Sequence, residues 1–213
     1  MRLLLRTRTT DSACALSAFL LLTAGFVLAE EVNQPAPELE IKMENGQVVK
    51  LSQYKGKPVV LEFFSTVCPH CQKSAESLEK TMRAYSAKGV QVIAVSTVED
   101  QRKDFPEFRK KYGATYPMGT IGSQEAYRFF SLSVMKPFYV PTYAFIDRNG
   151  VIKERFIGGI LPNDPNAGPA AELAEIAKHV DMLLKSGPAK PAAAARHPGA
   201  KPAAKPAPAT AKR

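Results

Sequence analysis

The stretch 58-PVVLEFFSTVCPHCQKSAESLEK-80 joins an apolar run, two cysteines and a helical pattern. Residues 58–65 are nearly all apolar and β-branched or aromatic, which predicts a strand buried on both faces. Over 69–88, apolar residues recur at spacings of three and four, which predicts a helix with one buried stripe. Cys68 and Cys71 stand where the strand passes into the helix. The stretch therefore predicts a buried strand that delivers a cysteine pair to the first turn of a helix.

The segments on either side complete an α/β pattern. Asn45-Gly46 predicts a hairpin within 39–51, because its turn requires positive φ. The run 90–97 predicts a second buried strand, and the helix before it implies that the two strands lie parallel in one sheet. Residues 30–38 read only as a polar lead-in. The other predicted elements are helices within 99–112, at 123–131 and at 169–185, and strands at 142–147 and 151–157 joined by a turn.

The net charge of +9 lies mostly outside the predicted domain. Residues 187–213 contribute +6 and residues 1–29 contribute +2, which leaves +1 for residues 30–186. A near-neutral domain gives little support for nucleic-acid binding, so no nucleic-acid partner is expected. The tail 187–213 is rich in proline, alanine and lysine, buries almost nothing and is expected to be disordered. It is either a solvated spacer or a contact to anionic surfaces.

The first 29 residues have the layout of a secretory signal peptide. Arginines precede the apolar run 13-ACALSAFLLLTAGFVLA-29, which ends in small residues. We place the cleavage after Ala29, and an uncleaved membrane anchor formed by 13–29 is the alternative. Both imply an exported domain, expected in the periplasm, where disulfides can form. Cleavage would remove Cys14 and leave Cys68 and Cys71 as the cysteines of the mature chain.

A Cys-x-x-Cys pair at a helix N-terminus suits thiol–disulfide exchange. The unpaired N–H groups and the positive end of the helix dipole lower the pKa of the first cysteine. Cys68 is thus the predicted nucleophile, and Cys71, one turn deeper, the predicted resolving thiol. Pro69 fits a first helical turn, and a protonated His70 would further favour the thiolate. A disulfide staple is less favoured because its loop is short, and structural zinc would need two more ligands.

Glu62 stands in the middle of the predicted buried strand, where a carboxylate is costly unless it is paired or functional. It could lie beneath the cysteines with a raised pKa and accept the proton of Cys71. Pairing with Lys57 or Lys153 is the alternative. We interpret the later histidines as surface residues and predict no metal or other cofactor; these residues are His179 and His197.

Val140 and Pro141 directly precede a predicted strand. A cis bond between them would hold the backbone beside the cysteines and leave main-chain groups free to pair with a substrate strand. An ordinary proline at a strand start is the alternative. The apolar side chains of 132–140 either line a substrate groove or pack inward.

The motifs 56-GKPVVLEFFSTVCPHC-71, 90-VQVIAVS-96 and 140-VPTYAFIDRNGVI-152, followed by Gly158-Gly159, occur in this order. Together they resemble the thioredoxin-like superfamily, and most of all its exported TlpA/ResA-type thiol-disulfide oxidoreductases. The resemblance covers roughly 35–185. It implies an α/β thioredoxin-like fold, with a central mixed sheet flanked by helices and an N-terminal β-hairpin extension. It also implies a cis bond before Pro141, Cys68 as nucleophile, Cys71 as resolving thiol and Glu62 as the buried acid.

The resemblance leaves the direction of electron flow open. The TlpA-like scaffold implies reduction of client disulfides, as in cytochrome c maturation, whereas Pro69-His70 is the dipeptide of the oxidising DsbA family. The expected partners are protein thiols and disulfides and a membrane or soluble redox partner. Two alternatives remain: a peroxiredoxin-like thiol peroxidase, since Ser65 stands three residues before Cys68, and a Sco-like copper carrier using both cysteines and a histidine.

Overall fold

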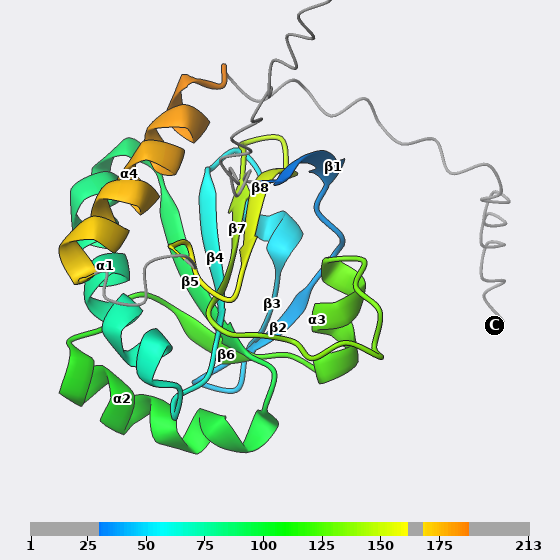
Figure 1. Ribbon diagram of the computed structural model, residues 1–213, viewed down its shortest axis with the longest axis vertical. Coiled ribbons are helices and arrows are strands. Elements are labelled where there is room, and N and C mark those ends of the chain that lie inside the picture. The colour runs from blue at the N-terminus through cyan, green and yellow to red at the C-terminus, as the bar shows by residue number, and fades with distance from the viewer. Residues whose placement is uncertain (1–29, 162–167, 188–213) are drawn as a thin grey trace, which may run out of the picture.

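The computed structural model describes residues 30–161 and 168–187 (Figure 1). One eight-stranded sheet runs through it in the order β1-β8-β7-β4-β5-β6-β2-β3. The strands are β1 (Glu30–Pro35), β2 (Glu40–Met43), β3 (Val48–Lys50), β4 (Val59–Phe64), β5 (Gln91–Ser96), β6 (Met118–Thr120), β7 (Thr142–Ile146) and β8 (Val151–Ile157). The helices are α1 (Pro69–Tyr85), α2 (Phe105–Tyr112), α3 (Ser123–Phe129) and α4 (Pro169–Lys185), with short 3-10 helices η1 (Leu51–Tyr54), η2 (Ser86–Lys88) and η3 (Glu99–Asp104).

The centre of the sheet is mixed, as predicted. β4 lies parallel to β5 on one side and antiparallel to β7 on the other. The predicted crossover helix α1 joins the two parallel strands, and the predicted hairpin of β2 and β3 extends the sheet by pairing with β6. The N-terminal hairpin is therefore a sheet edge rather than a separate appendage.

Residue parity along β4 divides the core into two layers. Val60 and Phe64 belong to a cluster with side chains of α1, α2 and α4, while Leu61 and Phe63 pack on the opposite face with α3. Because alternate residues of a strand point to opposite faces, Glu62 lies on the same face as Val60 and Phe64. The strand thus aims its one carboxylate at the face covered by α1, the helix that begins at the cysteine pair.

Two short strands were not predicted. β1 pairs with β8 through the backbone, with a register shift between Glu31 and Gln34, where Asn33 adopts a φ of 43°. β6 contains Gly119, where an added Cβ would lie 2.5 Å from Ile41 Cγ2. Neither strand has an alternating apolar pattern that could have predicted it. Backbone pairing at the sheet edge defines β1, and close packing on Gly119 defines β6.

The prediction that His179 is a surface residue is wrong. Its side chain is buried on α4 between the rings of Phe145 and Phe156 and contacts the carboxylates of Glu154 and Glu175. A histidine in an apolar stripe packs like an aromatic residue when polar groups lie beside its ring nitrogens. This one helps to hold α4 against the sheet.

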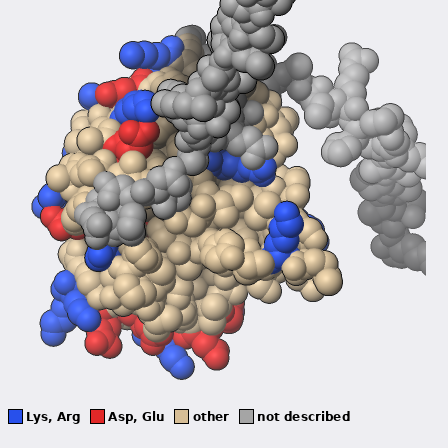
Figure 2. Space-filling view, in the orientation of Figure 1, with Lys and Arg blue, Asp and Glu red and all other residues tan. Residues whose placement is uncertain are grey.

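Charged side chains of both signs lie mainly along the edges of the face shown in Figure 2, and its middle is largely uncharged. In residues 30–161 and 168–187, no helix is long and apolar enough to span a membrane. The predicted signal peptide or anchor of residues 1–29 and most of the predicted tail, 188–213, lie outside the described residues, as does His197.

Candidate active site

Cys68 lies at the point where the loop after β4 enters α1. It is the N-cap residue of the helix, with extended backbone (φ −78°, ψ 120°), and Pro69 occupies the first helical turn as predicted. Its side chain is half-buried, whereas Cys71, one turn further along, is fully buried, and both cysteines are unpaired thiols. The unbonded N–H groups of the first turn face the Cys68 side of the helix and favour negative charge there.

Glutamine side chains hold the loop that precedes Cys68. Gln101 Oε1 accepts the backbone N–H of Thr66 at 3.2 Å, and its Nε2 donates to Ser65 Oγ at 2.8 Å. From the other side, Gln72 Nε2 donates to the backbone carbonyl of Thr66 at 2.9 Å. These contacts fix the backbone that presents Cys68. Gln101 could not be predicted from the sequence, since a polar residue in a short helix carries no periodic signal.

Val140 and Pro141 lie beside Cys68, as predicted. The bond between them is cis, and Cys68 Sγ is 3.6 Å from the Val140 carbonyl oxygen. Thr142 Oγ1 donates to the Tyr139 carbonyl at 2.6 Å and thereby anchors the turn. The structure therefore brings two segments that are far apart in the sequence to the same sulfur atom.

Glu62 is buried, and no lysine among residues 30–161 and 168–187 pairs with it. Its Oε1 accepts a hydrogen bond from Ser74 Oγ at 2.7 Å and lies 3.4 Å from Tyr143 Oη. Burial raises the pKa of Glu62 to about 8, with a further rise from the charge of Glu172, against the lowering effect of both hydroxyl contacts. The alternative pairing with Lys57 or Lys153 is therefore wrong, and the carboxyl can gain or lose a proton near neutral pH.

The buried thiol of Cys71 resists ionisation. Burial raises the pKa of Cys71, and the charge of Glu62 raises it further. Cys71 is thus protonated at neutral pH and must lose its proton before it can attack a disulfide. Glu62 is the nearby group whose pKa lies between that of an ordinary carboxyl and that of the thiol.

Polar residues that the sequence did not predict as part of the site surround Glu62. Ser74 and Ser77 of α1 and Glu172 of α4 lie on the buried faces of their helices. Glu172 is half-buried and precedes Ile176 and His179 by four and seven residues, so it falls on the apolar stripe of α4. A polar side chain at a stripe position is the signal that could have revealed it.

Apolar side chains are exposed next to Cys68 and in the segment that leads to Pro141. Val67, which immediately precedes Cys68, is 73% exposed, and Tyr139, two residues before Pro141, is 59% exposed. In the segment 132–140, Phe138 packs on Phe63, whereas Met135 is 89% exposed. Part of the segment therefore packs inward and part of it faces solvent, and the lining of a substrate groove stays a prediction.

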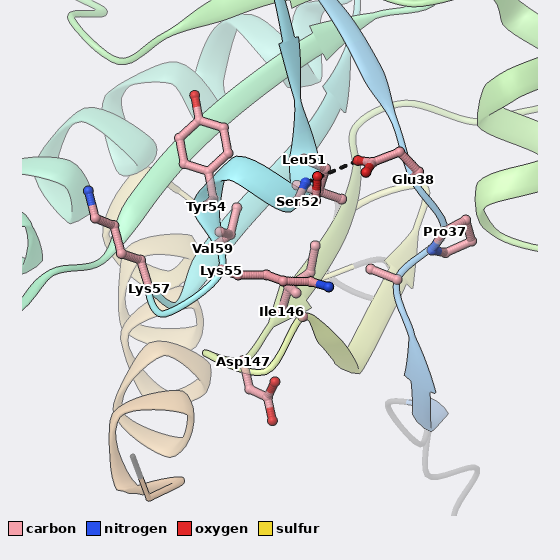
Figure 3. Close-up of a pocket in the computed structure, with 12 residues that line it drawn as sticks. Pro37, Glu38, Leu51, Ser52, Tyr54, Lys55, Lys57, Val59, Ile146 and Asp147 are labelled. Atoms are coloured by element: carbon pink, nitrogen blue, oxygen red, sulfur yellow. Dashed lines mark hydrogen bonds between the residues drawn. The ribbon is translucent and has the colours of Figure 1, made fainter. Parts of the chain in front are cut away.

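Two cavities lie at opposite ends of β4. One, of about 340 Å³, borders Val67 and is lined by aromatic and charged side chains of α2, including Phe108 and Glu107. The other, of about 200 Å³, lies where β4 begins and is lined by Tyr54, Lys55 and Asp147 among others (Figure 3). Only the first adjoins the cysteine loop. Among the described residues, no group of three or more His, Cys, Asp or Glu side chains could hold a metal ion.

Comparisons with known proteins place this geometry among thiol-disulfide proteins. A family model described as Redoxin matches residues 31–170. "Thiol-disulfide oxidoreductase ResA" of Geobacillus kaustophilus is 26% identical over 136 residues, which is 64% of this chain and 75% of that protein.

Solved structures agree with the predicted thioredoxin-like fold. The crystal structure of a putative thiol:disulfide interchange protein DsbE from Chlorobium tepidum has a TM-score of 0.58 at 25% identity, covering 74% of this chain and 99% of that one. A thioredoxin family protein from Chlorobium tepidum TLS has a TM-score of 0.57 at 22% identity, and the match covers 73% of this chain and 99% of that one. The likeness confirms the fold class that the motifs predicted.

Proposed function

Because this chain belongs to the Redoxin family, we propose that it is an exported thiol–disulfide oxidoreductase that exchanges disulfides with protein clients through Cys68 and Cys71. One observation carries the proposal: a half-buried cysteine caps α1 beside the Val140 carbonyl, with a second thiol buried one turn further on. The similar proteins named ResA and DsbE support it.

The exchange takes two sulfur–sulfur steps. The Cys68 thiolate attacks one sulfur of a client disulfide, a mixed disulfide forms, and the other client sulfur leaves as a thiolate. Cys71 then loses its proton to the Glu62 carboxylate and attacks Cys68 Sγ, which releases the second client sulfur as a thiolate and forms the Cys68–Cys71 disulfide. The same steps in reverse oxidise a client dithiol.

The turn at Val140 and Pro141 is the proposed binding site for the client backbone. An extended segment beside this turn could add main-chain hydrogen bonds in the manner of an extra strand. The exposed side chains of Val67, Met135 and Tyr139 would cover apolar residues next to the client cysteine. In this proposal Pro69 and His70 adjust the reactivity of Cys68 rather than contact the client.

Export of residues 30–186 would place the domain where client disulfides persist, with residues 1–29 as signal peptide or anchor and 187–213 as a tail able to contact anionic surfaces. Reduction of client disulfides for cytochrome c maturation is the role that the likeness to ResA and DsbE supports. The reduction potential sets the direction: a value near about −270 mV makes the protein a reductant and one near about −120 mV an oxidant.

The two alternatives have less support. Ser65, the residue that suggested a peroxidase, has its hydroxyl bound to Gln101 Nε2 and serves the loop. His179, a candidate third copper ligand, directs both ring nitrogens to Glu154 and Glu175. The relatives compared above bear names of thiol-disulfide enzymes.

Trapping with Cys71→Ser tests the proposal. Without the resolving thiol, a client should remain covalently joined to Cys68, and the adduct should dissociate on reduction. Cys68→Ser, with Cys71 intact, is the matched control and should trap nothing, because the buried thiol cannot reach a client. Equal trapping by the two variants, or none by Cys71→Ser in an oxidising medium that contains client disulfides, would overturn the proposal.

A further inference from the structure

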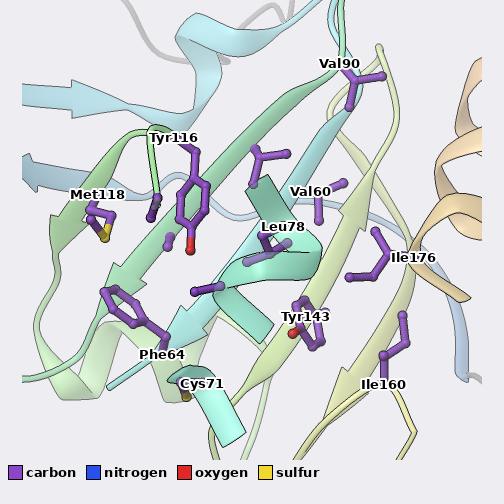
Figure 4. Close-up of a cluster of buried hydrophobic side chains, with 14 of the residues drawn as sticks. Val60, Phe64, Cys71, Leu78, Val90, Tyr116, Met118, Tyr143, Ile160 and Ile176 are labelled. Atoms are coloured by element: carbon purple, nitrogen blue, oxygen red, sulfur yellow. The ribbon is translucent and has the colours of Figure 1, made fainter. Parts of the chain in front are cut away.

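Two carboxyl groups, Glu62 on β4 and Glu172 on α4, lie on either side of the Tyr143 hydroxyl. Tyr143 Oη is 3.4 Å from Glu62 Oε1 and 2.8 Å from Glu172 Oε1. Serines of α1 bind both carboxyls: Ser74 Oγ lies 2.7 Å from Glu62, and Ser77 Oγ lies 3.1 Å from Glu172. Tyr143 is in the same buried cluster as Cys71 (Figure 4). The core therefore contains one connected line of oxygen atoms.

Glu62 has no direct access to water. Its side chain is 1% exposed, and the groups that act on it are Ser74, Tyr143, Glu172 and, through their own titration, Cys71 and Tyr116. A proton taken from Cys71 would therefore stay in the core and return to the sulfur, which would slow the attack of Cys71.

Glu172 connects the buried line to the surface. It is only half-buried, and it lies close enough to His70, which is exposed, for the charge of that imidazole to lower its pKa. Burial acts in the opposite direction and leaves the pKa of Glu172 above its ordinary value. A carboxyl in this position can exchange protons with both the core and water.

We propose that Tyr143 and Glu172 relay to solvent the proton that Glu62 accepts from Cys71. Protonated Glu62 donates its O–H to Tyr143 Oη, while the Tyr143 O–H bond breaks and its proton passes to the Glu172 carboxylate. Glu172 then releases the proton to water near His70. Tyr143 begins and ends neutral, and no oxidant or further reactant is required. The relay rests on the proposed exchange function.

The electrostatics agree with this geometry. Burial and the two neighbouring carboxylates raise the pKa of Tyr143 well above its ordinary value, so the hydroxyl passes protons without becoming a phenolate. Once Glu62 is protonated, its own O–H occupies the 3.4 Å contact, and the Tyr143 hydrogen turns to Glu172 at 2.8 Å. This orientation is the one that outward transfer requires.

Reaction of the reduced protein with dithiobis(nitrobenzoate) separates the two steps. The first release of coloured thiol reports attack by Cys68, and the second reports attack by Cys71 on the mixed disulfide. We expect Tyr143→Phe and Glu172→Gln each to slow the second release about tenfold, below the range of about 10²–10⁴ for full loss of a general base. The first release should stay within twofold of wild type, at about the precision of such assays.

The pH profile of the second release excludes a merely structural role. Loss of the Tyr143 hydrogen bond raises the pKa of Glu62, and loss of the Glu172 charge lowers it. The midpoint of the pH profile should therefore rise in Tyr143→Phe and fall in Glu172→Gln, while the plateau rate falls in both variants. A small external base such as imidazole should restore the plateau rate of Glu172→Gln, because it replaces the outermost acceptor.

Matched controls leave the relay intact. Tyr116→Phe removes a hydroxyl from the same buried cluster, and Glu175→Gln removes a carboxylate from α4 one turn away. Both should keep wild-type plateau rates. Unchanged plateau rates in Tyr143→Phe and Glu172→Gln, with a normal first release, would overturn the relay alone. Failure of the wild type to give any second release would instead overturn the exchange function.

Discussion

Replacing Glu62 by glutamine should stabilise the protein relative to wild type progressively as the pH rises. Burial raises the pKa of Glu62 from its ordinary value of 4.5 to about 8 in the folded protein. A carboxyl with a raised folded pKa contributes its full stability below pH 4.5, and this contribution is lost as pH rises through 8, because the unfolded chain ionises first.

The size of the stability change follows from the difference between the folded and unfolded pKa values of Glu62. Each pKa unit corresponds to about 1.4 kcal/mol, so the shift from 4.5 to about 8 amounts to roughly 5 kcal/mol. Glutamine does not ionise, and it has nearly the same shape as protonated glutamic acid. We therefore expect the free energy of unfolding of Glu62→Gln to lie within about 1 kcal/mol of the wild-type value near pH 4. Near pH 9 it should exceed the wild-type value by several kcal/mol.

Urea unfolding of the reduced proteins at several pH values measures the difference. Glu76→Gln is the matched control, because Glu76 is an exposed residue of α1 that pairs with Lys80, and its difference from wild type should stay nearly constant over the same range. A Glu62→Gln difference that does not change with pH would refute the raised pKa, and with it the basis for Glu62 as the base of Cys71.

Three further predictions concern residues outside the cysteine pair. His179→Ala should destabilise the fold by about 3 kcal/mol, since it leaves Glu154 buried without its partner; its urea midpoint should fall while its exchange rate stays at the wild-type level, and an unchanged midpoint would count against the pairing. Gln101→Ala should lower the rate of Cys68 attack about tenfold by releasing the loop at Ser65 and Thr66; stopped-flow thiol release measures it, and a wild-type rate would show that the loop needs no such support. Gly119→Ala should cost about 1–3 kcal/mol because its Cβ would meet Ile41 Cγ2 at 2.5 Å and the Lys42 carbonyl oxygen at 2.9 Å. Gly168→Ala, with no atom within 4 Å of the new Cβ, is its control in thermal unfolding, and equal losses in both would contradict the packing argument.

Much of the fold could be predicted because its central elements carry periodic patterns. β4 and β5 are continuous apolar runs, α1 and α4 carry apolar stripes, and glycine turns mark the hairpins. β1 and β6 could not be predicted, since backbone pairing and the absence of a side chain at Gly119 define them.

The site was predictable only where one stretch of chain forms it. Cys68, Cys71 and Glu62 lie within a single strand-loop-helix unit, so spacing and parity were enough to bring them together. Tyr143 and Glu172 reach Glu62 from β7 and α4, and their contact depends on how those elements pack. His179 was misread for the same reason, because its acidic partner Glu154 comes from β8.

Equilibration of the protein in glutathione redox buffers, with the Cys68–Cys71 linkage identified by peptide mass, tests the central claim most directly. Exchange through this pair predicts one reversible two-electron transition with a potential between about −120 and −270 mV, whose value also gives the direction of electron flow. A pair that stays reduced throughout, or that oxidises irreversibly at Cys68 without linking to Cys71, would contradict the claim.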